Sequence, residues 1–167
     1  PNALTTEGDH WQARARAKDS LGAYSAWYSV SNVVTIGNRA PADPAVLVLT
    51  PATPDTLTDL VATVSPAVPP DPDGDPVTYE FQWSKDGGIT WPEAGTTVGV
   101  NNTLSNSATA KGEVWQARVR ASDGRLTSNW VPSSNTLTIG NAPPTVPTSV
   151  SIGPGSPTTV NNLTATA

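Results

Sequence analysis

The residues with the clearest capacity for chemistry lie in an acidic segment, Asp71-Pro72-Asp73-Gly74-Asp75. Three carboxylates at every second position around a glycine turn can supply several of the about six to eight oxygen ligands that Ca²⁺ takes. The segment is not an EF-hand, because the twelfth position of such a loop would be Gln82 rather than a glutamate. Aspartate, proline and glycine are also ordinary turn residues, so a plain turn is the competing interpretation.

Three further positions could carry a ligand or a modification. Trp91 follows turn-forming residues, and an exposed indole ring can stack on a sugar. Asn101 and Asn162 each begin an Asn-x-Thr sequon, which is an N-glycosylation acceptor only in a source that performs this modification. Packing of Trp91 against its own domain and chance occurrence of the two sequons are the competing interpretations.

Nothing in the sequence indicates catalysis. The chain has one histidine, His10, and no cysteine, and it lacks the Gly-x-Ser-x-Gly and phosphate-loop motifs. No nucleophile therefore has a recognisable partner base, and we expect the protein not to be an enzyme. Calcium is the one cofactor that the residues indicate.

Composition restricts the partners and the location. The net charge of −5 disfavours a nucleic-acid partner, which requires a basic face. No stretch approaches the about 20 apolar residues of a membrane-spanning helix. Cysteine and methionine are both absent, which fits an oxidising extracellular location. The 17 prolines and 13 glycines favour short strands and turns over long helices.

An internal repeat organises the chain. The segment Gly8–Ala17 (GDHWQARARA) returns 104 residues later as GEVWQARVRA, and Thr35–Asn38 (TIGN) returns 103 residues later without change. The repeating unit is therefore about 103 residues long. We expect residues 1–38 to end one repeat, residues 39–141 to form a complete one and residues 142–167 to begin a third. The parent chain is then expected to be longer at both ends.

The complete repeat has the pattern of an all-β domain with seven short strands. Turn signals such as Asp123-Gly124 separate runs in which apolar and polar residues alternate. Five strands are predicted at residues 45–50, 57–64, 77–85, 113–121 and 134–139, and two more within residues 89–110.

Alternation also predicts which side chains face the core. Comparison of the repeats decides the ambiguous strands, since Leu47 and Leu49 match apolar Val150 and Ile152 whereas Val46 and Val48 match serines. The predicted inward residues are Leu47, Leu49, Leu60, Ala62, Val64, Val77, Tyr79, Phe81, Trp83, Trp115, Ala117, Val119, Ala121, Leu137 and Ile139.

The complete repeat resembles the immunoglobulin-like repeats of large bacterial surface and extracellular proteins, a broad group with PKD-like, cadherin-like and fibronectin-like modules. The residues that carry the resemblance are DPDGDPVTY (71–79), FQW (81–83), KGEVW (111–115), SDG (122–124) and IGNAP (139–143). The resemblance implies tandem immunoglobulin-like antiparallel β-sandwich domains joined by short proline-rich linkers. It implies little about function, because such modules serve many proteins.

In such a sandwich the loop that holds the acidic segment and the loop that begins at Asp123 lie at the same end, where the linker from the preceding repeat enters. Asp71, Asp73, Asp75 and Asp123 could then share one Ca²⁺, and resemblance to cadherins implies that this ion would stiffen the junction. The proline-rich linkers 38–44 and 141–147 favour semi-rigid spacing as well.

The remaining tryptophans and the arginines have structural interpretations. Trp11 repeats Trp115 and is expected in a core. Trp27 repeats Trp130, and these rings are expected to cap the region between the last two strands of a repeat, predicted at 113–121 and 134–139 in the complete one. Arg118 and Arg120 point outward and are expected to pair across strands with Gln82 and Glu80.

Together these features favour a structural or adhesive segment of a long extracellular fibre, stalk, sheath or surface protein. Its partners would be neighbouring repeats of the same chain, other copies in a fibre, or a surface polysaccharide. The alternatives are a carbohydrate-binding or spacer module of a secreted hydrolase and, more weakly, a phage or virion decoration domain. All of them predict the same fold.

Overall fold

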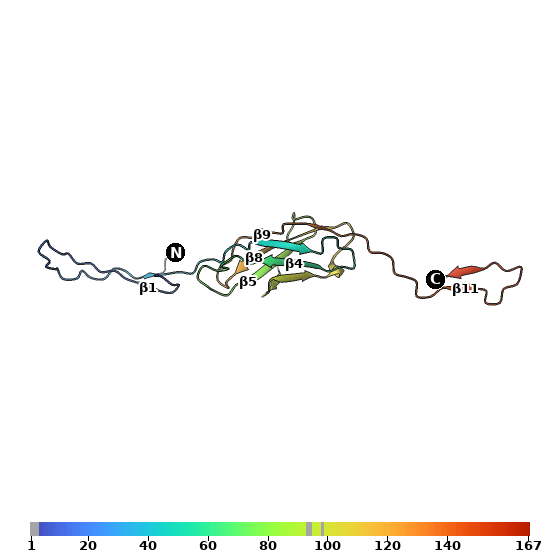
Figure 1. The fold of residues 1–167 in the computed structure, drawn as a ribbon, viewed down its shortest axis with the longest axis horizontal. Coiled ribbons are helices and arrows are strands. Elements are labelled where there is room, and N and C mark those ends of the chain that lie inside the picture. The colour runs from blue at the N-terminus through green and yellow to red at the C-terminus, as the bar shows by residue number, and fades with distance from the viewer. Residues whose placement is uncertain (1–3, 93–94, 98) are drawn as a thin grey trace.

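The computed structural model describes residues 4–92, 95–97 and 99–167, which form an elongated molecule (Figure 1). A β-sandwich occupies the middle. A long hairpin of residues 4–38, the N-terminal hairpin, extends from one end, and a shorter hairpin of residues 151–166 lies beyond the other (Figure 1). The described residues contain no α-helix, and so no helix that could cross a membrane.

Two antiparallel sheets face each other in the sandwich. One sheet has the order β3 (Val46–Thr50), β4 (Leu60–Ser65) and β7 (Asn101–Leu104). The other has the order β10 (Leu137–Thr138), β8 (Val114–Ser122), β5 (Thr78–Ser84) and β6 (Gly95–Thr97), with β9 (Val131–Pro132) also paired to β8. A short 3₁₀ turn, η1 (Asn106–Ala108), follows β7. The two hairpins pair β1 (His10–Trp11) with β2 (Val34–Thr35), and β11 (Ser151–Gly153) with β12 (Thr164–Thr166).

The core lies between the sheets and consists of the residues that alternation predicts. Thirteen apolar side chains are buried there, and Phe81 at its centre has no exposed surface. Val46 and Val48, predicted to face outward, are exposed. Trp83 lies at the margin of the core, where its Nε1 donates to Asn102 Oδ1 at 2.7 Å. Its ring also meets that of Trp115 edge to face, with centroids 6.3 Å apart.

The predicted strands agree with the observed ones within a few residues, except near residue 134. The strand predicted at 134–139 is only two residues long, because Ser134 and Asn135 bond across to β3 instead. The Asn135 amide accepts from the Leu49 N–H and donates to the Leu49 carbonyl, both at 2.9 Å. The uncertain region 89–110 contains β6 and β7.

Residues of the hairpins that were predicted to face inward are exposed. Trp11, the counterpart of Trp115, is 46% exposed, and Val150 and Ile152 are exposed too. In the described part of the chain no second sheet covers either hairpin, so these side chains have nothing to pack against. The predicted boundaries at residues 38 and 141 stay predictions.

The expectation that Trp27 and Trp130 cap the connection between the last two strands of their repeats stays a prediction. Trp130 lies on the outer face of the sheet, where the guanidinium groups of Arg118 and Arg120 stack on its ring at 4.8 and 4.7 Å. Trp27 stacks with Arg14 and Arg16 in the same way in the N-terminal hairpin, at 4.4 and 4.6 Å. Both arginines of β8 also make their predicted cross-strand bonds, since Arg118 donates to Gln82 and Arg120 to Glu80, each at 2.7 Å.

Candidate cation site at the first junction

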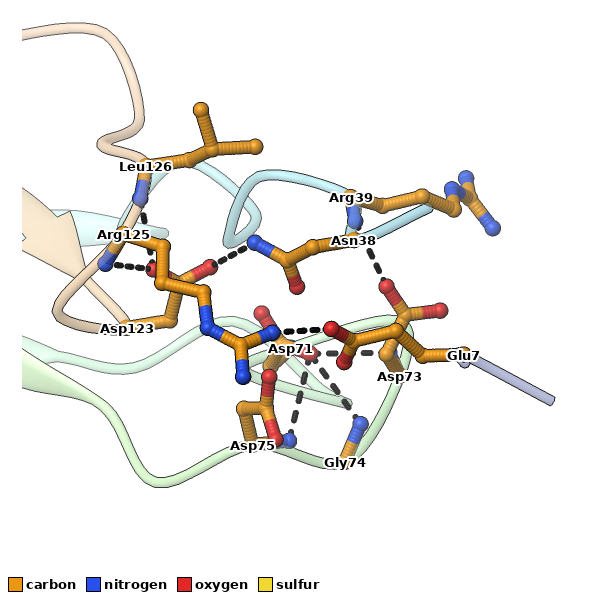
Figure 2. A network of polar contacts seen from close by, with 10 residues as sticks. All are labelled: Glu7, Asn38, Arg39, Asp71, Asp73, Gly74, Asp75, Asp123, Arg125 and Leu126. Carbon is orange, nitrogen blue, oxygen red and sulfur yellow. Dashed lines mark hydrogen bonds and ion pairs between the residues drawn. The ribbon is translucent and has the colours of Figure 1, made fainter. Parts of the chain in front are cut away.

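The acidic loop, residues 71–75, connects β4 to β5 at the end of the sandwich that faces the N-terminal hairpin. Asp71 is 3% exposed and organises the loop, because its Oδ1 accepts from the backbone N–H groups of Asp73, Gly74 and Asp75 at 2.8, 3.0 and 3.2 Å. Gly74 has a φ of 89°, a left-handed conformation that glycine adopts without steric cost. This turn leaves Asp73 and Asp75 partly exposed on the same loop (Figure 2).

Asp123 follows β8 at the same end, and the pairing of Thr78 with Ser122 brings it next to the start of β5. Its Oδ1 accepts from the N–H groups of Arg125 and Leu126, both at 2.7 Å. Its Oδ2 accepts from Asn38 Nδ2 at 2.9 Å. The bond from Asn38, together with these backbone bonds, lowers the pKa of Asp123 below its usual value.

The preceding segment is tied to this end by several polar contacts, which define the first junction (Figure 2). Besides the Asn38–Asp123 bond, the Arg39 N–H donates to Asp73 Oδ2 at 2.7 Å. Glu7, from the N-terminal hairpin, forms an ion pair with Arg125. Further along the linker, Asp43 accepts from the backbone N–H of Asn129 at 2.8 Å. The linker is therefore docked on the sandwich over much of its length.

Two buried oxygen atoms at this junction have no hydrogen-bond partner among the described residues. They are Asp71 Oδ2 and Asn38 Oδ1. Figure 2 shows the Asn38 oxygen directed toward the acidic loop. Leaving a buried acceptor unpaired costs free energy, and the cost is larger for a charged group. A cation between these oxygens would supply the missing partner.

The chemistry of the surrounding groups suits a hard cation. Every acidic or amide group at the junction offers oxygen, which is the donor that Ca²⁺ prefers. The carboxylates are not gathered into a ready cage, however. Within the described residues no group of three or more His, Cys, Asp or Glu side chains is positioned to hold a metal. Asp71 and Asp123 each commit one oxygen to backbone N–H groups, and the Arg125 guanidinium lies among the acids (Figure 2).

The structure thus brings all four predicted residues, Asp71, Asp73, Asp75 and Asp123, to one end of the sandwich. Whether they bind calcium stays a prediction. Sequence reasoning missed Glu7, Asn38 and Arg125, which complete the junction. A signal for Asn38 was present, because the TIGN motif that contains it recurs in both repeats. No pattern marked Glu7, since a lysine stands at its repeat counterpart.

The other predicted positions take no part in the polar contacts described for this junction. Trp91 is partly buried, and the Arg118 guanidinium stacks on its ring at 4.5 Å, so a sugar could use only the rest of its surface. Asn101 lies in β7 with an exposed side chain, and Asn162 is exposed in the turn before β12. Sugar binding, glycosylation and the expectation that the chain is not an enzyme all stay predictions.

Comparisons with known proteins identify the fold alone. No protein-family model matches the chain, and no curated protein is similar to it in sequence. Among solved structures it is similar to the FN1-FN3 domains of chicken CNTN1, with a TM-score of 0.50 and 16% identity over 87% of this chain. It is also similar to domains A168-A170 of titin, with a TM-score of 0.51 and 16% identity over 67% of the chain. The match spans 49% of the CNTN1 chain and 37% of the titin chain. The chain therefore has the all-β, antiparallel architecture of tandem immunoglobulin-like and fibronectin-like domains.

Proposed function

We propose that this chain is a structural segment of an extracellular array of immunoglobulin-like repeats, in which a cation stiffens the junction between neighbouring repeats. The observation that carries the proposal is the docked linker of the first junction. Contacts from Glu7, Asn38 and Arg39 reach the sandwich in three places. A linker that only tethered two independent domains would not need these contacts.

Calcium is the cation that we propose, because oxygen is the donor that it prefers. Asp71 and Asn38 offer the two unpartnered oxygens, while Asp73, Asp75, Asp123 and Glu7 can supply carboxylate oxygen around them. A bound Ca²⁺ would provide positive charge that compensates the acidic side chains from both sides of the junction. These ligands come from the N-terminal hairpin, the linker and the sandwich, so occupancy would add to the polar contacts that already join these segments.

Small-angle X-ray scattering and thermal melting of the full chain test this proposal. Calcium is expected to raise the melting temperature and to narrow the distribution of particle lengths. A ligand at ten times its dissociation constant stabilises the folded state by about 1.4 kcal/mol, which gives a measurable shift. EDTA should reverse both effects.

A matched pair of variants locates the effect. Asp123→Asn removes a junction carboxylate, whereas Asp19→Asn changes the corresponding aspartate of the N-terminal hairpin. Asp19 also accepts from its own turn, at 3.0 Å from the Leu21 N–H and 2.8 Å from the Ala23 N–H, but it forms no hydrogen bond to a described residue of the sandwich. Only Asp123→Asn should weaken the calcium response. A wild-type chain whose melting and scattering ignore calcium would refute the cation-stiffened junction.

A further inference from the structure

The sheet formed by β3, β4 and β7 has an outer face without charged side chains. Alternation turns one set of side chains on these strands toward the core and leaves the other set in solvent. The outward set, termed the uncharged face, lies in three rows across the strands. The rows are Thr50, Val61 and Thr103, then Val48, Thr63 and Asn101, then Val46 and Ser65. Most of them are valine or threonine, whose β-branched side chains are stiff and make a flat surface.

The outer face of the opposite sheet has a different character. Arg118, Arg120 and Glu80 stand there, and the Trp130 ring lies against both arginines. Polar and charged side chains are the usual cover of a strand face that meets water. One sandwich therefore presents a charged face on one side and an uncharged face on the other.

The C-terminal hairpin repeats the uncharged face with other residues. Ser151 pairs with Thr166 there, as Val48 pairs with Thr63 in the sandwich. A serine stands where the sandwich has a valine, yet no charge is introduced. Residues 142–167 contain no charged side chain at all. The two repeats thus share the absence of charge on this face rather than particular residues.

The charge of the whole chain restricts what can cover the uncharged face. The net charge is −5, so two copies repel each other on approach, and a face without charge brings the fewest like charges together. A charged partner would find no counter-charge on this face. A polysaccharide would find no ring to stack on, because none of the outward side chains is aromatic. A second copy of the chain offers a flat and uncharged surface of the same kind.

We propose that two copies of this chain associate through the uncharged face, related by a two-fold axis. A two-fold contact uses the same patch on both partners, so a flat face without charges is complementary to itself. Sheets that pack in this way lie about 10 Å apart, with interdigitating side chains. The contact does not involve the calcium site and goes beyond the function proposed above.

The area of the face predicts a weak contact that repetition would strengthen. Three strands about 4.8 Å apart, with five residues of about 3.3 Å each, cover roughly 220 Å² on each copy. A stable pair of proteins buries about 800 Å² on each side. One sandwich should therefore associate only at about millimolar concentration, whereas an array would add such contacts along its length. That gain rests on the array proposed above, but the contact itself does not.

Backbone amide chemical shifts of the full chain, recorded at rising protein concentration, test the contact. We expect the shifts to move in β3, β4 and β7. We also expect added salt to strengthen association, because salt screens the repulsion between acidic copies. Constant shifts up to millimolar protein, association that weakens with salt, or shifts confined to the two hairpins would each overturn the proposal. It also fails if dextran, a neutral polysaccharide, moves the shifts of this face and protein concentration does not.

Two valines provide a matched pair of variants. Val48 is 38% exposed on the uncharged face, and Val114 is 37% exposed on the outer face of the opposite sheet. Replacement of either by lysine lowers the net negative charge by one, so the overall repulsion falls equally. Val48→Lys should abolish the concentration-dependent shifts, because an unpaired charge would be buried in the contact. Val114→Lys should keep them, and equal association of both variants would show that the copies meet elsewhere.

Discussion

Asp71→Asn should change stability in opposite directions with and without calcium. Asparagine keeps an oxygen that can accept from the three backbone N–H groups of the acidic loop. It replaces the unpartnered Oδ2 by an amide nitrogen that can donate a hydrogen bond. Asn38 Oδ1 is directed toward this loop and has no partner, so it can accept that bond (Figure 2). The calcium-free chain should therefore gain stability, while the calcium-loaded chain should lose a charged ligand.

The magnitude follows from the two unpartnered oxygens. Each buried polar atom without a partner costs about 1–3 kcal/mol. Relief of one of them should stabilise the calcium-free sandwich by about 1 kcal/mol, which corresponds to roughly 4–8 °C in a domain of this size. In calcium, the variant should lose the stabilisation of about 1.4 kcal/mol that a ligand at ten times its dissociation constant provides.

Differential scanning calorimetry in EDTA and in millimolar calcium measures both effects. Asp55→Asn serves as the control, because Asp55 accepts from its own turn, at 2.9 Å from the Leu57 N–H, and bridges to Gly140 at the other end of the sandwich. It should destabilise the chain equally in both solutions. If Asp71→Asn is destabilised to the same extent in EDTA and in calcium, the reasoning is refuted, and the acidic loop is only a turn that requires the aspartate.

Three other perturbations test the fold and the electrostatics. Phe81→Ala should destabilise the sandwich by about 3–5 kcal/mol in urea titrations, because the side chain is fully buried, and a smaller loss would show that the core collapses around the gap. Trp130→Ala should cost about 1–3 kcal/mol through the loss of stacking on Arg118 and Arg120, and no change would show that the ring only covers solvent-exposed surface. The lowered pKa of Asp123 stabilises the fold above the unfolded value of about 3.9, and this contribution is lost as the pH falls through the lower folded value. The urea midpoint should consequently fall less steeply below pH 5 in Asp123→Asn than in the wild type, and equal slopes would contradict a role for this carboxylate.

The sequence carried enough information to predict the sandwich. Strand residues alternate between two faces, so a buried core leaves a period-two pattern that is visible in Leu47 and Leu49 or in Tyr79 and Phe81. Comparison of corresponding positions in two repeats gave an independent test of each face. It placed Val46 and Val48 outside, because serines stand at their counterparts. Cross-strand pairs such as Arg120 with Glu80 were also predictable, because strand register follows from the same alternation.

The face that Trp130 covers was not predictable in the same way. A tryptophan just beyond a strand can turn either way, and its sequence context does not say which face it covers. The choice was decided by the two arginines on the neighbouring strand β8, whose guanidinium groups offer a partner for the ring on the outer face.

The sequence by itself determined the fold class and the repeat, because local alternation and turn chemistry govern these features. That Asp71, Asp73, Asp75 and Asp123 lie at one end of the sandwich was implied by the resemblance to immunoglobulin-like repeats. Only the tertiary structure showed that Glu7 and Asn38 join them, and that two oxygens there lack partners. Glu7 lies 116 residues before Asp123 in the sequence. Contacts over such a separation depend on how the linker directs one repeat against the next, and no local pattern records that direction.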